Sequence, residues 1–100
     1  MNSYRVYVIE CTTISQRVTV HVGIAKVVAK RLHDHRCGKV RATRGRTIKW
    51  LGNSDRMPHA DALLLEMRLK KLTPKKKRSW AAIHRETSIL EERALAEETP

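Results

Sequence analysis

Alternating apolar and polar positions mark two strands near the start of the chain. Residues 4–11 are rich in β-branched and aromatic side chains, and residues 17–23 alternate valines with polar residues. A period of two is typical of strands that bury one face against a core. The polar segment 12–16 between them is suited to a turn. The pattern therefore predicts an antiparallel hairpin, with His21 on the polar face of its second strand.

The middle of the chain predicts a helix followed by a third strand. Residues 25–36 place their apolar side chains loosely on one side, as in a helix with one buried face, and Gly38 is suited to end it. A basic loop without an acidic residue follows over residues 38–46. Residues 47–51 have the composition of a short strand, and the polar segment 52–55 leaves it.

The second half of the chain predicts further helices. Residues 59–72 carry so many apolar side chains that we expect a central buried helix, with Pro58 suited to its first turn. Thr73 is the expected N-cap of the next helix, with Pro74 at its first position. A last helix is expected over residues 87–97.

The order β-β-α-β-α-α describes a small α/β fold. We expect a three-stranded antiparallel sheet flanked by helices, with an extra C-terminal helix. One hundred residues is the size of one domain. The folded domain is assigned to residues 1–85. Because the charge turns acidic near the end, residues 86–100 are assigned to an acidic C-terminal helix or tail, for which Thr87 is the expected cap.

The charge balance favours a polyanionic partner. Lysine and arginine number 21 against 10 acidic residues, which gives a formal net charge of +11. Such a field attracts nucleic acid. A membrane surface is the weaker alternative, because no helix combines an aromatic apolar face with a clean basic face. Cys11 and Cys37 do not make a disulfide framework. With no signal peptide or membrane span in the sequence, we expect an intracellular protein, in the cytoplasm or with nucleic acid.

Two basic segments are the expected binding surfaces for nucleic acid. One is the loop before the third strand, with Lys39, Arg41, Arg44 and Arg46. The other lies in the first turn of the helix that begins at Pro74, with Lys75, Lys76 and Lys77. Cations at that end of a helix oppose its dipole. A placement that costs stability is consistent with a functional use, although a solvated run of charges is the ordinary explanation.

Short motifs follow one another in a characteristic order, and they include Val6-Tyr7-Val8, His21-Val22-Gly23, Lys30-Arg31-Leu32 and Leu65-Glu66. In order and spacing they resemble the GIY-YIG nuclease superfamily, most closely its small stand-alone branch of single-domain proteins. The resemblance covers residues 4–80. It implies a three-stranded antiparallel sheet flanked by helices and the metal-dependent hydrolysis of DNA phosphodiesters.

The resemblance also implies a set of site residues. Tyr7 takes the place of the first-motif tyrosine, Arg31 that of the helix arginine, and Glu66 that of the glutamate that binds Mg²⁺ or Mn²⁺. His35 matches a histidine near the site in several members, and Lys26 a lysine near the nucleophile in some. His21 stands where the second motif normally has a tyrosine.

These residue types suit phosphodiester hydrolysis. A tyrosine with a lowered pKa, or a histidine, can take a proton from water. An arginine offers a bidentate fork to the phosphate, and we expect Arg31 and His35 to approach one phosphate together from their i, i+4 spacing. One glutamate can hold a Mg²⁺ that keeps most of its waters.

Ordinary structural roles remain open for the same residues. Tyr7 can be plain core, Arg31 a solvated helix cation, and Glu66 can pair with Lys70. The asparagine that supports the site in many family members is absent or replaced by a group such as Thr73.

Three functions follow. The first is a metal-dependent DNA endonuclease of low intrinsic sequence specificity. The second is a nucleic-acid-binding or regulatory module weakened by His21. The third is a protein-interaction adaptor that uses the acidic C-terminal helix, through which a homodimer or a protein partner can also form. We expect the endonuclease.

Overall fold

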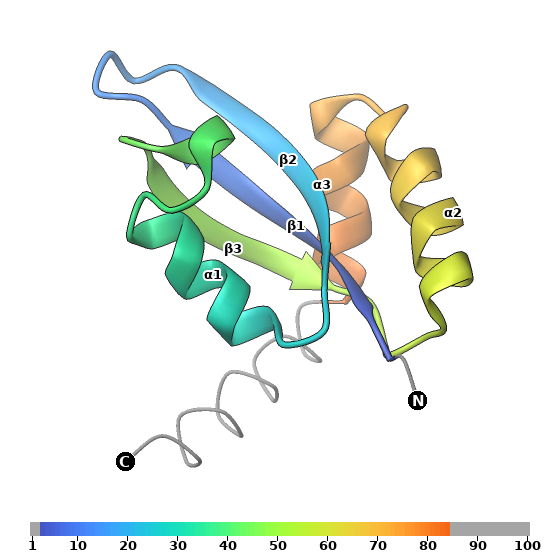
Figure 1. The fold of residues 1–100 in the computed structure, drawn as a ribbon. Coiled ribbons are helices and arrows are strands. Elements are labelled where there is room, and N and C mark those ends of the chain that lie inside the picture. The colour runs from blue at the N-terminus through green and yellow to red at the C-terminus, as the bar shows by residue number, and fades with distance from the viewer. Residues whose placement is uncertain (1–2, 85–100) are drawn as a thin grey trace.

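The computed structural model describes residues 3–84. It contains a three-stranded antiparallel sheet with helices on both faces (Figure 1). The strands lie in the order β2-β1-β3, so β1 is central. This arrangement confirms the α/β fold class predicted from the sequence. In chain order the elements are β1 (Arg5–Thr12), β2 (Val18–Ala25), α1 (Val28–Arg36), the short 3₁₀ helix η1 (Arg41–Thr43), β3 (Thr47–Asn53), α2 (His59–Lys70) and α3 (Pro74–Ile83).

Most element bounds depart from the predicted ones by one to three residues, and two of these departures have a clear local cause. Helix α1 begins at Val28, later than predicted, because Val27 is still extended. Strand β3 continues to Asn53, beyond its predicted end, because pairing with Tyr7 of β1 extends it. The predicted helix over residues 87–97, with the acidic segment 86–100 that contains it, lies outside the described residues.

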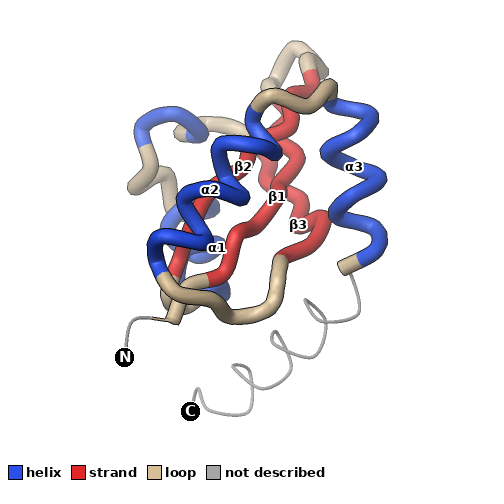
Figure 2. The backbone as a smooth tube through the Cα atoms, turned by 90° about the vertical axis from the view of Figure 1, so that its right-hand side faces the viewer, coloured by secondary structure: helices blue, strands red, loops and turns tan. Residues whose placement is uncertain are grey.

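Strand β1 contributes side chains to a core on each face of the sheet. Tyr7, Ile9 and Cys11 pack with Leu32 on the side that α1 covers. Val6 packs on the opposite side, with residues of α2, and Val8 packs there with residues of α3. Figure 2 shows the sheet between these two helical layers. The alternation read from the sequence therefore separates two half-cores, joined by one central strand.

Helix α2 is not the central buried helix that its apolar composition predicts. Only Ala62 and Leu69 are buried along it. Leu63, Leu64 and Met67 are 42%, 54% and 55% exposed. The helix packs on one face of the sheet through one side, and its apolar residues lie around more of its circumference than that side covers. Composition alone does not reveal how many faces of a helix find a partner.

The helix ends follow the expected capping chemistry in part. Thr73 caps α3 by accepting a hydrogen bond from the Lys76 amide, and Pro74 occupies the first turn, as predicted. Gly38 follows α1 with φ of 75°, which suits glycine past a helix end. Pro58 lies at the N-cap position of α2, one residue before the predicted first turn.

Helix α3 approaches β3 at a glycine. A Cβ atom at Gly52 would overlap the backbone carbonyl of Ala81. The neighbouring residue, Leu51, is the extra residue of a bulge, because Val8 pairs with Gly52 while Ile9 pairs with Trp50. Contact between the backbones of β3 and α3 thus depends on the absence of a side chain at position 52.

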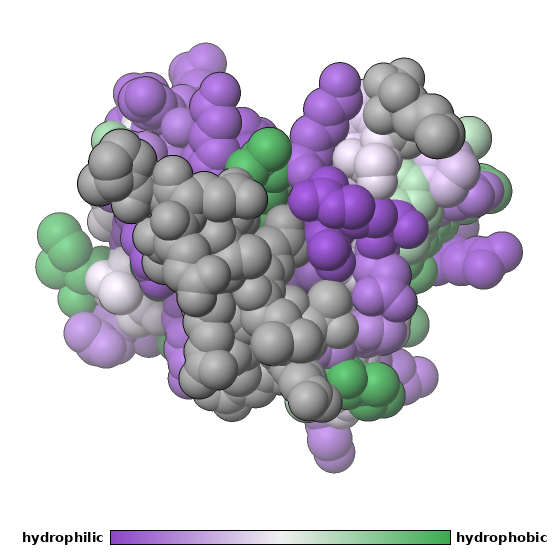
Figure 3. All heavy atoms as spheres, turned by 90° about the horizontal axis from the view of Figure 1, so that it is seen from below, coloured by the Kyte–Doolittle hydropathy of each residue, from purple (hydrophilic) through white to green (hydrophobic). Residues whose placement is uncertain are grey.

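Polar side chains predominate among the described residues that can be seen from below. Figure 3 shows these hydrophilic side chains together with a few separate hydrophobic ones. Within residues 3–84, no helix has the length and apolar character needed to cross a membrane.

Candidate active site at the β2 edge

The ring of Tyr7 lies across strand β2 in a space that Gly23 leaves open. The two residues pair across the β1–β2 ladder, and a Cβ atom at Gly23 would overlap the Tyr7 ring and hydroxyl. The ring also stacks on Trp50 of β3, with centroids 5.3 Å apart. Tyr7 is 3% exposed. The glycine therefore brings the hydroxyl of a core tyrosine toward the β2 edge of the sheet.

A chain of hydrogen bonds links Tyr7 to α1 and η1. The Tyr7 hydroxyl lies 2.8 Å from Nε2 of His35, and Nδ1 of His35 lies 2.7 Å from Oγ1 of Thr43. The Thr43 hydroxyl donates to the carbonyl of Val40 at 3.5 Å. Thr43 Oγ1 therefore accepts a hydrogen bond from Nδ1–H, which leaves Nε2 of a neutral imidazole to accept a hydrogen bond from the Tyr7 hydroxyl.

Burial favours the neutral form of both rings. Burial raises the pKa of Tyr7, and Arg31 offsets part of that rise by hydrogen bonding and charge. Burial lowers the pKa of His35, and the charge of Arg31 lowers it further. The lowered tyrosine pKa suggested by the sequence is thus wrong in direction. His35 lies 5% exposed behind Tyr7, so it does not approach a phosphate beside Arg31 as predicted.

Arg31 and Glu66 both affect the pKa of Tyr7, and they do so from different layers. Arg31 belongs to α1, and its Nε is buried without a hydrogen-bond partner among residues 3–84. Glu66 belongs to α2 on the other face, yet its charge contributes to the raised pKa of Tyr7. Since β2 is an edge strand, the site straddles that edge. Glu66 also pairs with Lys70 at 3.6 Å, so the ordinary i, i+4 contact exists as well.

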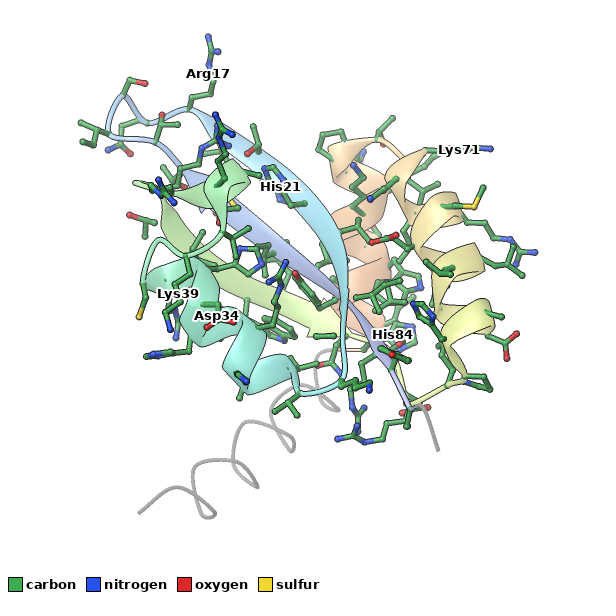
Figure 4. The ribbon with its side chains drawn as sticks, in the orientation of Figure 1. Arg17, His21, Asp34, Lys39, Lys71 and His84 are labelled. Atoms are coloured by element: carbon green, nitrogen blue, oxygen red, sulfur yellow. The ribbon has the colours of Figure 1, made fainter. Side chains whose placement is uncertain are left out.

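His21 projects from β2 near this cluster (Figure 4). Arg46 donates to Thr19 Oγ1 at 3.2 Å, and the Thr19 hydroxyl lies 3.0 Å from Nε2 of His21. Burial lowers the pKa of His21, and the charges of Arg46 and Lys77 lower it further. The charge of His21 in turn contributes to the lowered pKa of His35. The structure therefore places His21 beside the site, as a neutral imidazole close to two cations.

Lys26 lies at a cavity rather than against Tyr7. Its Nζ is 5.4 Å from the centre of the Tyr4 ring. The cavity has a volume of about 420 Å³, and Arg31 lines it as well. Tyr7 and His35 do not line this cavity, so Lys26 is separated from them, whereas Arg31 both lines the cavity and acts on Tyr7.

The two predicted basic segments differ in how free their cations are. In the loop, Arg41 is exposed, Lys39 pairs with Asp34 at 3.9 Å and Arg44 donates to the Gly38 carbonyl. Arg46 is half-buried against Thr19. In α3, Lys75 and Lys76 are exposed, whereas Lys77 is half-buried and acts on His21. Arg46 and Lys77 therefore connect the basic segments to the site.

A single carboxylate is the metal donor that the site offers. Residues 3–84 contain no group of three or more histidine, cysteine, aspartate or glutamate side chains that could hold a metal ion. Glu66 has a side chain 19% exposed, and its partner Lys70 is a solvated cation at 57%. Mg²⁺ is commonly bound through one or two carboxylates together with waters and substrate phosphates. The donor set fits a magnesium ion shared with a phosphate, and it does not fit a protein-only metal cage.

Two contributors to the site had no role in the sequence interpretation. Trp50 supports the Tyr7 ring by stacking, and Thr43 sets which nitrogen of His35 carries the proton. Thr43 belongs to η1 and folds back onto α1 across a loop. Neither residue has a helical or strand spacing to its partner, so no sequence pattern indicates the contact.

No protein-family model, curated protein or solved structure matches this chain. The function proposed below therefore rests on the described side chains and their chemistry.

Proposed function

We propose that this protein is a metal-dependent DNA endonuclease of low intrinsic sequence specificity. The hydrogen-bonded series from Tyr7 through His35 to Thr43 carries the proposal, because it leads a proton away from a hydroxyl that Arg31 and Glu66 also influence. The resemblance of the motif order to GIY-YIG nucleases supports the same function. A net charge of +11 supports a polyanionic substrate.

Tyr7 and His35 act together as the base. A water molecule gives a proton to the Tyr7 oxygen while the Tyr7 proton moves to Nε2 of His35. The tyrosine then stays neutral throughout, which suits its raised pKa, and the new imidazolium keeps its Nδ1–H bonded to Thr43. The water approaches on the side of Tyr7 on which Arg31 lies.

The hydroxide formed from this water attacks phosphorus and forms a pentavalent phosphate. Arg31, whose guanidinium acts on Tyr7 by hydrogen bonding and charge, faces the negative charge of this phosphate. The bond from phosphorus to the leaving oxygen then breaks, and that oxygen takes a proton from solvent. Glu66 is the residue that would hold Mg²⁺ or Mn²⁺, and the bound ion would supply charge neutralisation at the phosphate.

The test is nicking of supercoiled plasmid by the purified full chain with Mg²⁺, Mn²⁺ or EDTA. We expect metal-dependent nicking, lost at least about 100-fold in Glu66→Ala, the scale of one transition-state electrostatic contact. Asp61→Ala is the matched control, because Asp61 is an exposed carboxylate of the same helix. Equal nicking by Glu66→Ala and the wild type would contradict the metal-ligand role.

A binding or regulatory module is the second candidate function. His21 in place of the second-motif tyrosine favours it, because the imidazole is held by Thr19 rather than free at the site. Tight, salt-sensitive DNA binding with no nicking in either metal would establish this function instead.

A further inference from the structure

An open cavity lies at the N-terminal end of α1, next to the candidate active site but separate from its proton-transfer groups. Its volume is about 420 Å³, within the range typical of small-molecule sites. Apolar side chains line part of it, from Ile24, Ala25 and Val27, together with the Tyr4 ring. The cavity thus offers a surface on which an apolar or weakly polar group such as a sugar can pack.

Cations gather around the same cavity. Lys26, Lys30 and Arg31 all line it. The one lining carboxylate, Asp34, has Lys39 at 3.9 Å, and Figure 4 shows the two side by side. The local charge balance therefore favours an anion.

Two further observations indicate where the anion would bind. Arg31 has a buried Nε with no hydrogen-bond partner among the described residues. Helix α1 begins without a side-chain cap, since Val27 cannot supply one, and its first turn holds no acidic residue. Uncapped amides at a helix N-terminus attract phosphate groups. Arginine, lysines and amide groups therefore converge on a cavity with apolar walls.

We propose that this cavity binds the nucleotide next to the cleaved bond, with its phosphate on Lys30, Arg31 and the start of α1 and its sugar on the apolar wall. The inference rests on the proposed nuclease function for its place in catalysis. Arg31 joins the two sites, because it lines the cavity and also acts on Tyr7. A flanking phosphodiester held here would set which phosphate lies beside Tyr7.

Thymidine 3′,5′-bisphosphate is the probe, titrated into the ¹⁵N-labelled full chain and followed by amide chemical shifts. We expect saturable shifts around residues 26–31. Lys30→Gln should weaken binding about tenfold, the effect of one charge-assisted hydrogen bond. Val27→Trp fills the cavity from a position that is 42% exposed, so it should abolish binding while the fold persists. Lys49→Gln, which removes the same charge from an exposed position on β3, should bind as the wild type does.

Inorganic phosphate and thymidine are titrated separately, and each should bind at least about tenfold more weakly than the bisphosphate. Inorganic phosphate binding as tightly, or shifts confined to residues outside the cavity, would overturn the inference.

The two proposals fail in different ways. Bisphosphate binding does not require Glu66, so Glu66→Ala should retain it. Binding at the cavity without plasmid nicking would reject the nuclease function and keep the nucleotide site. Nicking without any shift at residues 26–31 would reject the nucleotide site and keep the nuclease.

Discussion

Burial and hydrogen bonding have opposite effects on the proton of the Tyr7 hydroxyl. Burial makes the free tyrosinate costly and raises the pKa, whereas the neutral imidazole of His35 accepts the proton at 2.8 Å. A tyrosine alone would be a poor base in this place. The pair avoids a tyrosinate because the charge appears on His35, whose other nitrogen donates to Thr43, although burial and the charge of Arg31 also lower the pKa of His35.

Acidification should destabilise the fold through His35. The pKa of His35 in the folded state is lowered from 6.5, so near and below about pH 6.5 the unfolded chain binds more protons than the folded protein does. The free energy of unfolding therefore decreases as the pH is lowered. One such group contributes at most about 1.4 kcal/mol per pH unit. Urea unfolding between about pH 7.5 and pH 5.5 measures this slope, and His35→Gln should reduce it.

His33→Gln is the matched control, because His33 lies on the exposed side of the same helix. His21 has a pKa shifted in the same direction, so His21→Gln should also remove part of the slope. An identical slope in the wild type and His35→Gln would show that His35 is not held neutral by the fold.

At the residue scale, motif order predicted a set of site residues but not the contacts that they make. The structure brings Tyr7, Arg31, His35 and Glu66 together electrostatically. Depth of burial is a property of the packed layers, so the sequence suggested a lowered pKa for Tyr7 where the structure gives a raised one. The contact of Thr43 with His35 had no signal in the sequence, because it depends on how η1 folds back onto α1.

At the element scale, the contact between β3 and α3 depends on Gly52. Gly52→Ala should destabilise the protein by about 1–3 kcal/mol, the usual cost of overpacking, because the added Cβ overlaps the backbone at Ala81 and not a movable side chain. Thermal unfolding should show a midpoint lower by about 4–8 °C for each kcal/mol.

Lys49→Ala is the control for this prediction, because Lys49 is an exposed residue of the same strand. It should change stability by no more than about 0.5 kcal/mol. A Gly52→Ala protein as stable as the wild type would mean that α3 moves away from the sheet at little cost.

The strands and their faces were predictable because a period of two carries the information locally. The burial of α2 was not. An apolar helix is buried on all sides only if other elements cover every side. Among the described residues, nothing covers the side of α2 that carries Leu63, Leu64 and Met67, which are exposed. The bulge at Leu51 likewise depends on how β3 pairs with β1, and the sequence of β3 alone does not predict it.

At the scale of the whole molecule, some of the cations contact other residues, as Lys39, Arg44 and Arg46 do, whereas others are exposed to solvent. Lys75 and Lys76 are exposed at the start of α3, where they oppose the helix dipole. Replacing both with glutamine should weaken DNA binding and reduce the slope of log K against log salt by about 2, since each phosphate contact contributes about 0.9. Fluorescence anisotropy with a short duplex over a salt series measures this slope.

The same double variant should not lose stability, because it removes cations from the positive end of a helix. Weaker binding then cannot be attributed to unfolding. Lys49→Gln on β3, at the opposite edge of the sheet from β2, is the control for removing a charge. An unchanged salt slope in the double variant would exclude the start of α3 from the binding surface.

Glu66 follows Tyr7, Arg31 and His35 along the chain and is therefore the last of these four residues to be synthesised. The segments that form β1, β2 and α1 are complete before Glu66, the proposed metal ligand, has been added. On the proposed function, a chain that terminates before residue 66 lacks the metal ligand and cannot cut DNA. The order of residues along the chain would thus keep such truncated copies harmless to the genome of the producing cell.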